Sequence, residues 1–377
     1  MTMNQPFVYF SKMFQAVPQL MEVHKFAGGV FVSNRRSTLD AVHKLYPNVE
    51  LARYRSWFKQ YSVGFKAMKS ASAIITGAPT PLLLSEFSAV KAMVFHGTYM
   101  LLSKSTLQQL DHFDLLCTIG PRMRKTIDRY RNELQLKQIV ESGYLPFGSF
   151  PKKSEALTQS SLTRLGLSPG KKTVTYMPWG KPHGSWLQMA EKIVRETPCD
   201  FNLILRPHPS QGLTARREDV ASFKRVSALC AKRPHTLLDI NACSLSQLFS
   251  LADLMVTDGT SPAEESLYYD VPQLFIQTPL WSEDVIRAHA EKNHIPEDEA
   301  GEYLDLFKCG TSFDTRRDAD FGRAIHAAIE SGTSFQARRQ AYFSWVFGPR
   351  DRQAGACVQQ AVLNLINSSN TMTSLPR

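Results

Sequence analysis

The chain has 377 residues, of which 43% are hydrophobic and 21% are charged. At about 150 residues per domain, this length predicts two domains. The composition is typical of a globular protein with a sizeable core, and it excludes a disordered chain, a collagen-like chain and a small disulfide scaffold. Lys and Arg number 44 against 34 Asp and Glu, so the formal charge is +10.

The first half of the chain alternates short apolar runs, each ending in turn residues, with helical patterns. This alternation predicts an α/β domain with a parallel sheet over residues 1–150. The expected strands are Gly29–Ser33, Ala73–Thr76, Ala92–Phe95 and Leu115–Thr118, with a helix at Ser37–Leu45.

Positive charge is concentrated in two parts of this half. No Asp or Glu occurs from Leu51 to Ser85, where basic residues alternate with aromatic ones. These are Arg53, Arg55, Lys59, Lys66 and Lys69, with Tyr54, Trp57, Phe58 and Tyr61; a second cluster holds Arg122, Arg124, Lys125, Arg129 and Arg131. Such clusters suit anionic lipid, nucleic acid or an anionic polymer, but a solvated helix face gives the same pattern.

A polar, Gly- and Pro-rich stretch from Gly143 to Lys172 predicts an inter-domain connection with one short helix, and we place the linker at 151–172. The β/α pattern then restarts and predicts a second α/β domain over 173–345. Its expected strands are Thr173–Met177, Phe201–Leu205, Thr236–Leu238, Leu254–Thr257 and Gln273–Ile276, and its expected helices are Ser185–Glu196, Ser244–Leu251 and Ala263–Tyr269. Residues 346–377 are predicted to form a helix, Ala354–Ile366, and a frayed polar tail.

No part of the sequence predicts a membrane span or an export signal. Polar residues interrupt the first 29 positions, and no window approaches the about 20 apolar residues of a transmembrane helix. The six cysteines form neither a C-x-x-C pair nor a zinc-finger spacing. We therefore expect reduced cysteines in a cytoplasmic protein.

Two predicted strands end in a histidine-containing segment. Arg206 and His208 follow Phe201–Leu205 and alternate with prolines that stiffen the turn. Arg and His supply donors for phosphate oxygens, and ligands of open α/β sheets bind beyond the carboxyl ends of strands. His96-Gly97-Thr98 ends Ala92–Phe95, where the histidine could act as a general base or could simply cap the strand. Arg122 follows the next strand in the same way.

A third strand, Leu254–Thr257, runs into Asp258-Gly259-Thr260-Ser261, and a helix then begins near Pro262. Hydroxyls and backbone N–H groups at a helix start can hold a phosphate, or they can cap the helix. Glu264 and Glu265 fall in the first turn, where carboxylates complement the helix dipole as well.

Together these segments resemble the CDP-glycerol glycerophosphotransferase family of bacterial enzymes that build polyol-phosphate polymers such as teichoic acids and some capsules. The resemblance covers about residues 70–355 in the family's order. It rests on His96-Gly97-Thr98, Arg206-Pro207-His208-Pro209 and Thr257-Asp258-Gly259-Thr260-Ser261 with Glu265 and Pro272, and, less strongly, on Ser72–Gly77, Gly143-Tyr144, Tyr176–Trp179 and Phe347-Gly348. The chain departs from the family at Gly259, where an aromatic residue is usual, and at Glu265, where Asp is usual.

The resemblance implies the GT-B architecture, two Rossmann-like domains facing across a cleft. It implies transfer of glycerol phosphate from CDP-glycerol to a hydroxyl of a growing polymer or lipid-linked primer, with release of CMP. The expected catalytic residues are His96 and His208. The expected donor-binding residues are Arg206, Asp258, Thr260, Ser261 and Glu265, and the expected acceptor-side residues are Gly97, Thr98 and Arg122.

No tightly bound metal or other cofactor is expected, because no clustered acids have metal-ligand spacing; Mg²⁺ could still bind through the donor phosphates. The basic aromatic stretch could contact the anionic polymer or the inner face of the membrane. Alternatives are a GT-B glycosyltransferase, a sugar-nucleotide 2-epimerase, a degenerate GT-B subunit without turnover, and a non-catalytic protein that binds an anionic polymer or nucleic acid. No specific nucleic acid is expected, since no nucleic-acid-binding motif is present.

Overall fold

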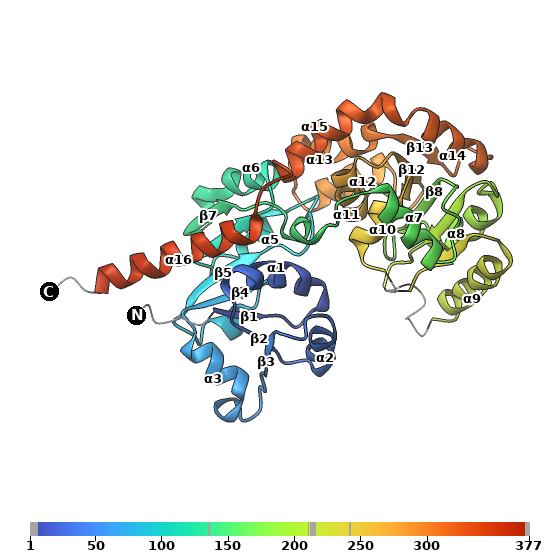
Figure 1. The fold of residues 1–377 in the computed structure, drawn as a ribbon. Helices are drawn as coiled ribbons and strands as arrows, with labels where there is room; N and C mark the ends of the chain where they lie inside the picture. The colour runs from blue at the N-terminus through green and yellow to red at the C-terminus, as the bar shows by residue number, and fades with distance from the viewer. Residues whose placement is uncertain (1–6, 135, 210, 212–215, 241–242, 374–377) are drawn as a thin grey trace. The chain divides into compact units, whose positions relative to one another are not determined.

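The computed structural model describes residues 7–134, 136–209, 211, 216–240 and 243–373 (Figure 1). The chain divides into two compact units. Unit 1 comprises residues 1–149 and 344–377, and unit 2 comprises residues 150–343. Unit 2 therefore interrupts unit 1 in the sequence, and its second boundary falls inside the helix α15 (Gln336–Phe347).

Unit 1 contains a seven-stranded parallel sheet in the order β3-β2-β1-β4-β5-β6-β7. The strands are β1 (Phe7–Phe10), β2 (Val30–Ser33), β3 (Glu50–Arg53), β4 (Ala73–Thr76), β5 (Val90–Val94), β6 (Leu115–Thr118) and β7 (Gln138–Glu141). The helices are α1 (Val17–Ala27), α2 (Arg36–Leu45), α3 (Val63–Ser70), α4 (Pro81–Leu84), α5 (Lys104–Gln108), α6 (Pro121–Tyr130) and α16 (Ala354–Thr373). This is the Rossmann order, whose reversal falls between β1 and β4.

Unit 2 repeats the arrangement with a six-stranded parallel sheet in the order β10-β9-β8-β11-β12-β13. The strands are β8 (Thr173–Met177), β9 (Asn202–Leu205), β10 (Thr236–Leu238), β11 (Leu254–Thr257), β12 (Gln273–Gln277) and β13 (Thr311–Asp314). The helices are α7 (Glu155–Arg164), α8 (Trp186–Glu196), α9 (Arg217–Lys232), α10 (Leu245–Leu251), α11 (Ser261–Ser266), α12 (Glu283–Lys292), α13 (Glu297–Leu304), α14 (Phe321–Glu330) and most of α15. The strand order reverses between β8 and β11.

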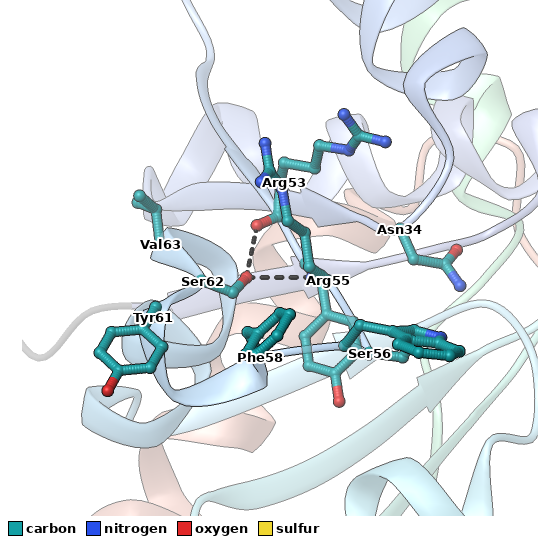
Figure 2. A pocket seen from close by; sticks show the side chains of 10 residues that line it. Asn34, Arg53, Arg55, Ser56, Phe58, Tyr61, Ser62 and Val63 are labelled. Atoms are coloured by element: carbon teal, nitrogen blue, oxygen red, sulfur yellow. Dashed lines mark hydrogen bonds between the residues drawn. The ribbon is translucent and has the colours of Figure 1, made fainter.

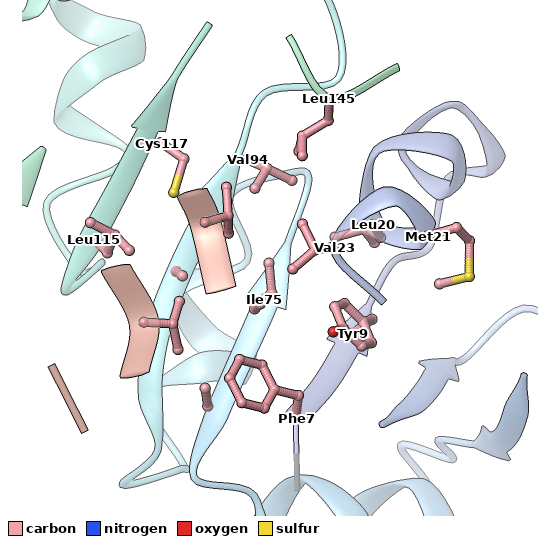
Figure 3. Close-up of a cluster of buried hydrophobic side chains, with 14 of the residues drawn as sticks. Phe7, Tyr9, Leu20, Met21, Val23, Ile75, Val94, Leu115, Cys117 and Leu145 are labelled. Atoms are coloured by element: carbon pink, nitrogen blue, oxygen red, sulfur yellow. The ribbon is translucent and has the colours of Figure 1, made fainter. Parts of the chain in front are cut away.

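Each unit has its own core. In unit 1, side chains of the central strands pack against α1, and Tyr9, Ile75, Val94 and Leu115 are fully buried there (Figure 3). Helix α16 closes the same cluster with Val358 and Val362. In unit 2 the strands pack against α8, α9 and α14 around Trp186. Because such strands are buried on both faces, they consist of continuous apolar runs, and these runs are recognisable in the sequence.

The two-domain α/β prediction is confirmed, and the predicted strands recur within one or two residues. Four strands were not predicted: β1, β3, β7 and β13. The predicted linker does carry a short helix, α7, but Leu162 of that helix is buried in a cluster of unit 2 with Leu248 and Leu251. The final helix continues to Thr373, beyond the predicted end at Ile366, and it belongs to the core of unit 1.

All six cysteines are free, and Cys199 is exposed. None of the helices in the described part of the chain has the length and apolar character needed to cross a membrane.

Candidate active site

In unit 1, His96 lies just beyond the end of β5, two residues past Val94. Its Nδ1 lies 2.6 Å from the carbonyl oxygen of Gly77, which follows β4. A carbonyl only accepts, so Nδ1 carries the proton and donates it, and Nε2 is the basic nitrogen. The hydroxyl of Tyr99 lies 3.0 Å from Nδ1 and 3.4 Å from Nε2. Burial lowers the pKa of the His96 imidazole, and the bond to Gly77 offsets part of that shift. A neutral, oriented imidazole of this kind suits a general base.

The segment that carries His96 is held from two sides. The side chain of Gln19, on α1, donates to the His96 carbonyl at 3.2 Å. Arg122, on α6, donates to the Thr98 carbonyl at 3.2 Å. Both Arg122 and Thr98 are buried. In the structure, this predicted acceptor-side pair therefore supports the loop that carries His96. Gly97 lies between His96 and Thr98 and is half-buried.

In unit 2, Asp258 lies at the point where the strand order reverses. Its Oδ2 accepts hydrogen bonds from the backbone N–H of Trp179, at 2.7 Å, and of Ser185, at 3.0 Å. One carboxylate oxygen therefore ties the loop after β8 to the end of β11. Its Oδ1 is buried and lacks a hydrogen-bond partner among the described residues. Burial raises the pKa of Asp258 to about 6, and the bonds to Ser185 and Trp179 act against that rise.

Arg206 lies directly beyond β9, and it forms an ion pair with Asp239 through Nη1. Asp239 follows β10 and is fully buried, and its Oδ1 also accepts from the backbone N–H of Cys243 at 3.2 Å. The predicted phosphate-binding arginine is thus oriented by an acid that sequence reasoning missed. The signal was available, since Asp239 comes directly after a predicted strand in the same way as Asp258.

His208 lies two residues beyond Arg206, against Gly180 in the loop after β8. A Cβ built on Gly180 would stand 2.8 Å from Nδ1 of His208, so only a glycine leaves room for the imidazole there. Burial lowers the pKa of His208. The loops after β8 and β9 therefore converge on one edge of the sheet.

The residues that start α11 complete this edge. Thr260 is buried and its side chain does not cap the helix, so capping does not account for its hydroxyl. Ser261 begins the helix, and Glu265 lies on it and is buried. The neighbouring Glu264 accepts a hydrogen bond from the Tyr342 hydroxyl at 2.7 Å, which accounts for that carboxylate within the fold.

The structure explains why position 259 is a glycine. Gly259 has a positive φ of 75°, and a Cβ there would stand 2.6 Å from the ring of Phe307. Its carbonyl accepts from the Tyr303 hydroxyl at 2.6 Å. The aromatic ring that the family usually carries at this point of the sequence would meet Phe307, which fills the space from another segment.

An aromatic cluster beside Asp258 was also missed. The ring of Trp179 stacks on His183 at 5.2 Å and meets Trp281 edge-on at 4.5 Å between centroids. Trp179 and His183 follow β8 and Trp281 follows β12, so strands distant in sequence bring the rings together. Of the three, only Trp179 belongs to a segment that resembles the family, and no spacing in the sequence relates it to Trp281.

The second basic cluster of the sequence is largely used within unit 1. Arg124 pairs with Asp128 at 2.6 Å, Lys125 lies over the ring of Trp345, and Arg122 is buried. Among the described residues, no group of three or more His, Cys, Asp or Glu side chains is arranged to hold a metal ion.

Two Rossmann-type units in one chain, each with its polar groups at the carboxyl ends of parallel strands, define a GT-B fold. Among solved structures the chain is similar to the wall teichoic acid polymerase TagF, with a TM-score of 0.65 and 15% identity over 97% of this chain and 90% of TagF. It is also similar to HepE of Anabaena in complex with UDP and glucose, with a TM-score of 0.54 and 13% identity over 98% of this chain and 100% of HepE. Sucrose-phosphate synthase of Thermosynechococcus elongatus gives a TM-score of 0.53 and 14% identity over 97% of this chain and 100% of that one. The resemblance inferred from the motifs is therefore confirmed at the level of the fold.

No family model matches the chain, and neither does any curated protein.

Proposed function

We propose that this protein transfers glycerol phosphate, or a related polyol phosphate, from a CDP-activated donor to a hydroxyl of a polymer or lipid-linked primer. The observation that carries the proposal is the position of the sequence motifs in the fold. The three segments that resemble the family in sequence fall beyond the carboxyl ends of β5, β9 and β11. One structure of TagF, which shares the fold, was determined after a soak with CDPG.

Unit 2 would hold the donor. Arg206, His208, Thr260 and Ser261 would contact its phosphates, and Glu265 would accept hydrogen bonds from the ribose hydroxyls. Asp258 would act on the donor through the loop that it anchors, because its Oδ2 is already bonded to two backbone amides. Charge that grows on the departing nucleotide would be offset by Arg206 and His208.

Unit 1 would supply the base. An acceptor hydroxyl oxygen would form a bond to the phosphorus of the polyol phosphate while the bond from that phosphorus to the CMP oxygen breaks. Nε2 of His96 would take the hydroxyl proton, and CMP would leave with the electron pair. Arg122 and Thr98 would hold the His96 segment in place for this step.

The reaction needs no resident metal in this scheme, and Mg²⁺ could bind through the donor phosphates. The reaction would take place in the cytoplasm or at the inner face of the membrane, where a lipid-linked primer is reached. No specific nucleic acid enters the proposal.

The test is nucleotide release by the purified protein. CDP-glycerol, CDP-ribitol and two UDP-sugars would be offered with and without a polyol-phosphate acceptor. We expect release of CMP, only with a CDP-polyol and only when the acceptor is present. Release of UDP or CDP would instead assign glycosyl transfer, which the UDP and glucose bound to HepE and the name of sucrose-phosphate synthase favour. Conversion of a UDP-sugar to its 2-epimer would assign an epimerase, and nucleotide binding without release would assign a degenerate subunit.

A further inference from the structure

The segment 53–63 of unit 1, called here the aromatic-basic loop, exposes apolar side chains to an unusual degree. Trp57 is 83% exposed, Phe58 78%, Tyr61 73% and Val63 66%. The loop follows β3 and surrounds a hollow of about 620 Å³ that is also lined by Asn34 (Figure 2). Four large apolar groups within seven residues exceed the single exposed side chains that are normal on a protein surface.

The loop is held in this shape by its own bonds. The buried hydroxyl of Ser62 donates to the Arg53 carbonyl at 2.7 Å and accepts from the Arg55 N–H at 3.0 Å, as Figure 2 shows. Tyr54 is buried and its ring meets Phe10 edge-on. Lys59 pairs with Glu86 at 2.6 Å. The exposed rings are therefore presented by a fixed loop that does not fold them into the core.

Phe58 has a left-handed backbone, with φ of 55°. This conformation is uncommon for a residue other than Gly, Asn or Asp and is strained for a bulky side chain. The fold therefore holds Phe58 in a costly conformation and leaves its ring exposed. A partner for these rings would give the arrangement a use.

Apart from Lys59, the cations around the rings have no acidic partner among the residues that the structure describes. Arg53, Arg55, Lys66 and Lys69 are exposed, and none of them forms an ion pair with a residue that the structure describes. The sequence from Leu51 to Ser85 holds no Asp or Glu. Unlike the Arg122–Arg131 cluster, whose charges are largely engaged, this surface keeps its positive charge for an external partner.

We propose that the aromatic-basic loop docks the protein on an anionic phospholipid surface. Trp57, Phe58, Tyr61 and Val63 would enter the interface between headgroups and acyl chains, where amphipathic aromatic rings are stable. Arg53 and Arg55 would bind the headgroup phosphates. The inference rests on the proposed function only in identifying the phospholipid surface as the inner face of the membrane. A soluble polyol-phosphate chain matches the arginines but not Phe58 and Val63, so the lipid surface fits the whole loop better.

The experiment is binding of the full-length protein to vesicles of equal parts phosphatidylglycerol and phosphatidylcholine, and to vesicles of phosphatidylcholine alone, at 0.1 M salt. We expect binding to the anionic vesicles only. Arg53→Ala with Arg55→Ala should weaken it by about 30-fold, from the contribution of each basic residue near a charged membrane. Trp57→Ser with Phe58→Ser should weaken it further. Brominated acyl chains should quench part of the wild-type fluorescence, and Trp57→Phe should remove that quenching while binding persists.

Matched controls lie on unit 2. Lys224→Ala with Lys232→Ala on α9 removes the same charge from exposed positions, and Leu157→Ser removes an apolar side chain that is 58% exposed. Both should leave vesicle binding unchanged. Absence of wild-type binding, or equal losses in the loop and control variants, would overturn the proposal. It would also be overturned if the loop variants kept vesicle binding but lost binding to soluble poly(glycerol phosphate), since the loop would then belong to the acceptor. Nucleotide release with a soluble acceptor needs no vesicle, so it reports separately on the proposed function.

Discussion

The backbone N–H of Trp179 donates to the carboxylate of Asp258 at 2.7 Å, so that one oxygen joins the loop after β8 to the end of β11. The two strands are neighbours in the sheet but lie about 80 residues apart in the chain. The bond crosses the point where strand order reverses, which is where ligands of such sheets bind. The same oxygen accepts from Ser185, so it holds both ends of the intervening loop.

Replacing Asp258 by Ala should therefore destabilise unit 2. Two amide groups would lose their acceptor, at a cost of about 1–3 kcal/mol for each buried group left unpaired. Because the pKa of Asp258 is raised to about 6, its stabilising contribution is present below the ordinary carboxyl pKa of 3.8 and is lost as pH rises through 6. Wild type should thus lose stability relative to Asp258→Asn between pH 5 and pH 7.5. Urea unfolding at both pH values measures this, and a difference that stays constant would contradict the raised pKa.

His96→Ala should lower turnover by about 10²–10⁴-fold while leaving donor affinity unchanged, since a general base acts on the acceptor proton. Burial lowers the pKa of His96 below its ordinary value of 6.5, so the basic form persists to lower pH. The acid limb of kcat/KM should then have its midpoint below 6.5. Steady-state kinetics across pH, with calorimetric donor binding beside them, make the measurement. Lost donor binding with intact chemistry would remove His96 from this role.

Gly180→Ala should impair His208 without unfolding the protein. The new Cβ would stand 2.8 Å from the imidazole, so the ring must move. We expect turnover to fall toward that of His208→Ala, with a small change in thermal stability. Gly170→Ala is the matched control, because nothing lies within 4 Å of a Cβ there. Equal activity of the two glycine variants would mean that the place of His208 against this loop does not matter for the reaction.

The Arg206–Asp239 pair allows a structural role to be separated from donor binding. Asp239→Asn should destabilise the fold by about 3–5 kcal/mol, because it leaves the Arg206 charge without its buried partner. Arg206→Met combined with Asp239→Asn should recover much of that loss, since the uncompensated charge is gone. Donor affinity should stay low in the double variant if Arg206 binds phosphate. Chemical unfolding and nucleotide-binding titrations give both quantities, and recovery of donor affinity in the double variant would make Arg206 a structural residue.

The fold and most of the candidate site could be predicted from the sequence because the relevant signals are local. A strand buried on both faces is a short apolar run, so β4, β6, β8 and β11 appear with their observed bounds. Residues that end parallel strands must gather at one sheet edge, and for this reason the sequence alone predicts that His208 and Thr260 belong to one candidate site. The edge strand β3, with mixed burial, and β7, which is only half-buried, lack the apolar run and were missed.

Local sequence pattern is enough to specify the two α/β units, the strand-end positions of His96, Arg206, His208 and Asp258, and the basic, aromatic character of residues 53–63. What these groups face depends on how distant segments pack. Tertiary packing pairs Asp239 with Arg206, brings two loop amides to Asp258 and brings the Gly77 carbonyl to His96. It also adds α16 to the core of the first unit. The reason is physical: apolar periodicity is set by a residue's neighbours along the chain, whereas a buried polar atom is satisfied by whichever segment the folded sheet brings within about 3 Å of it.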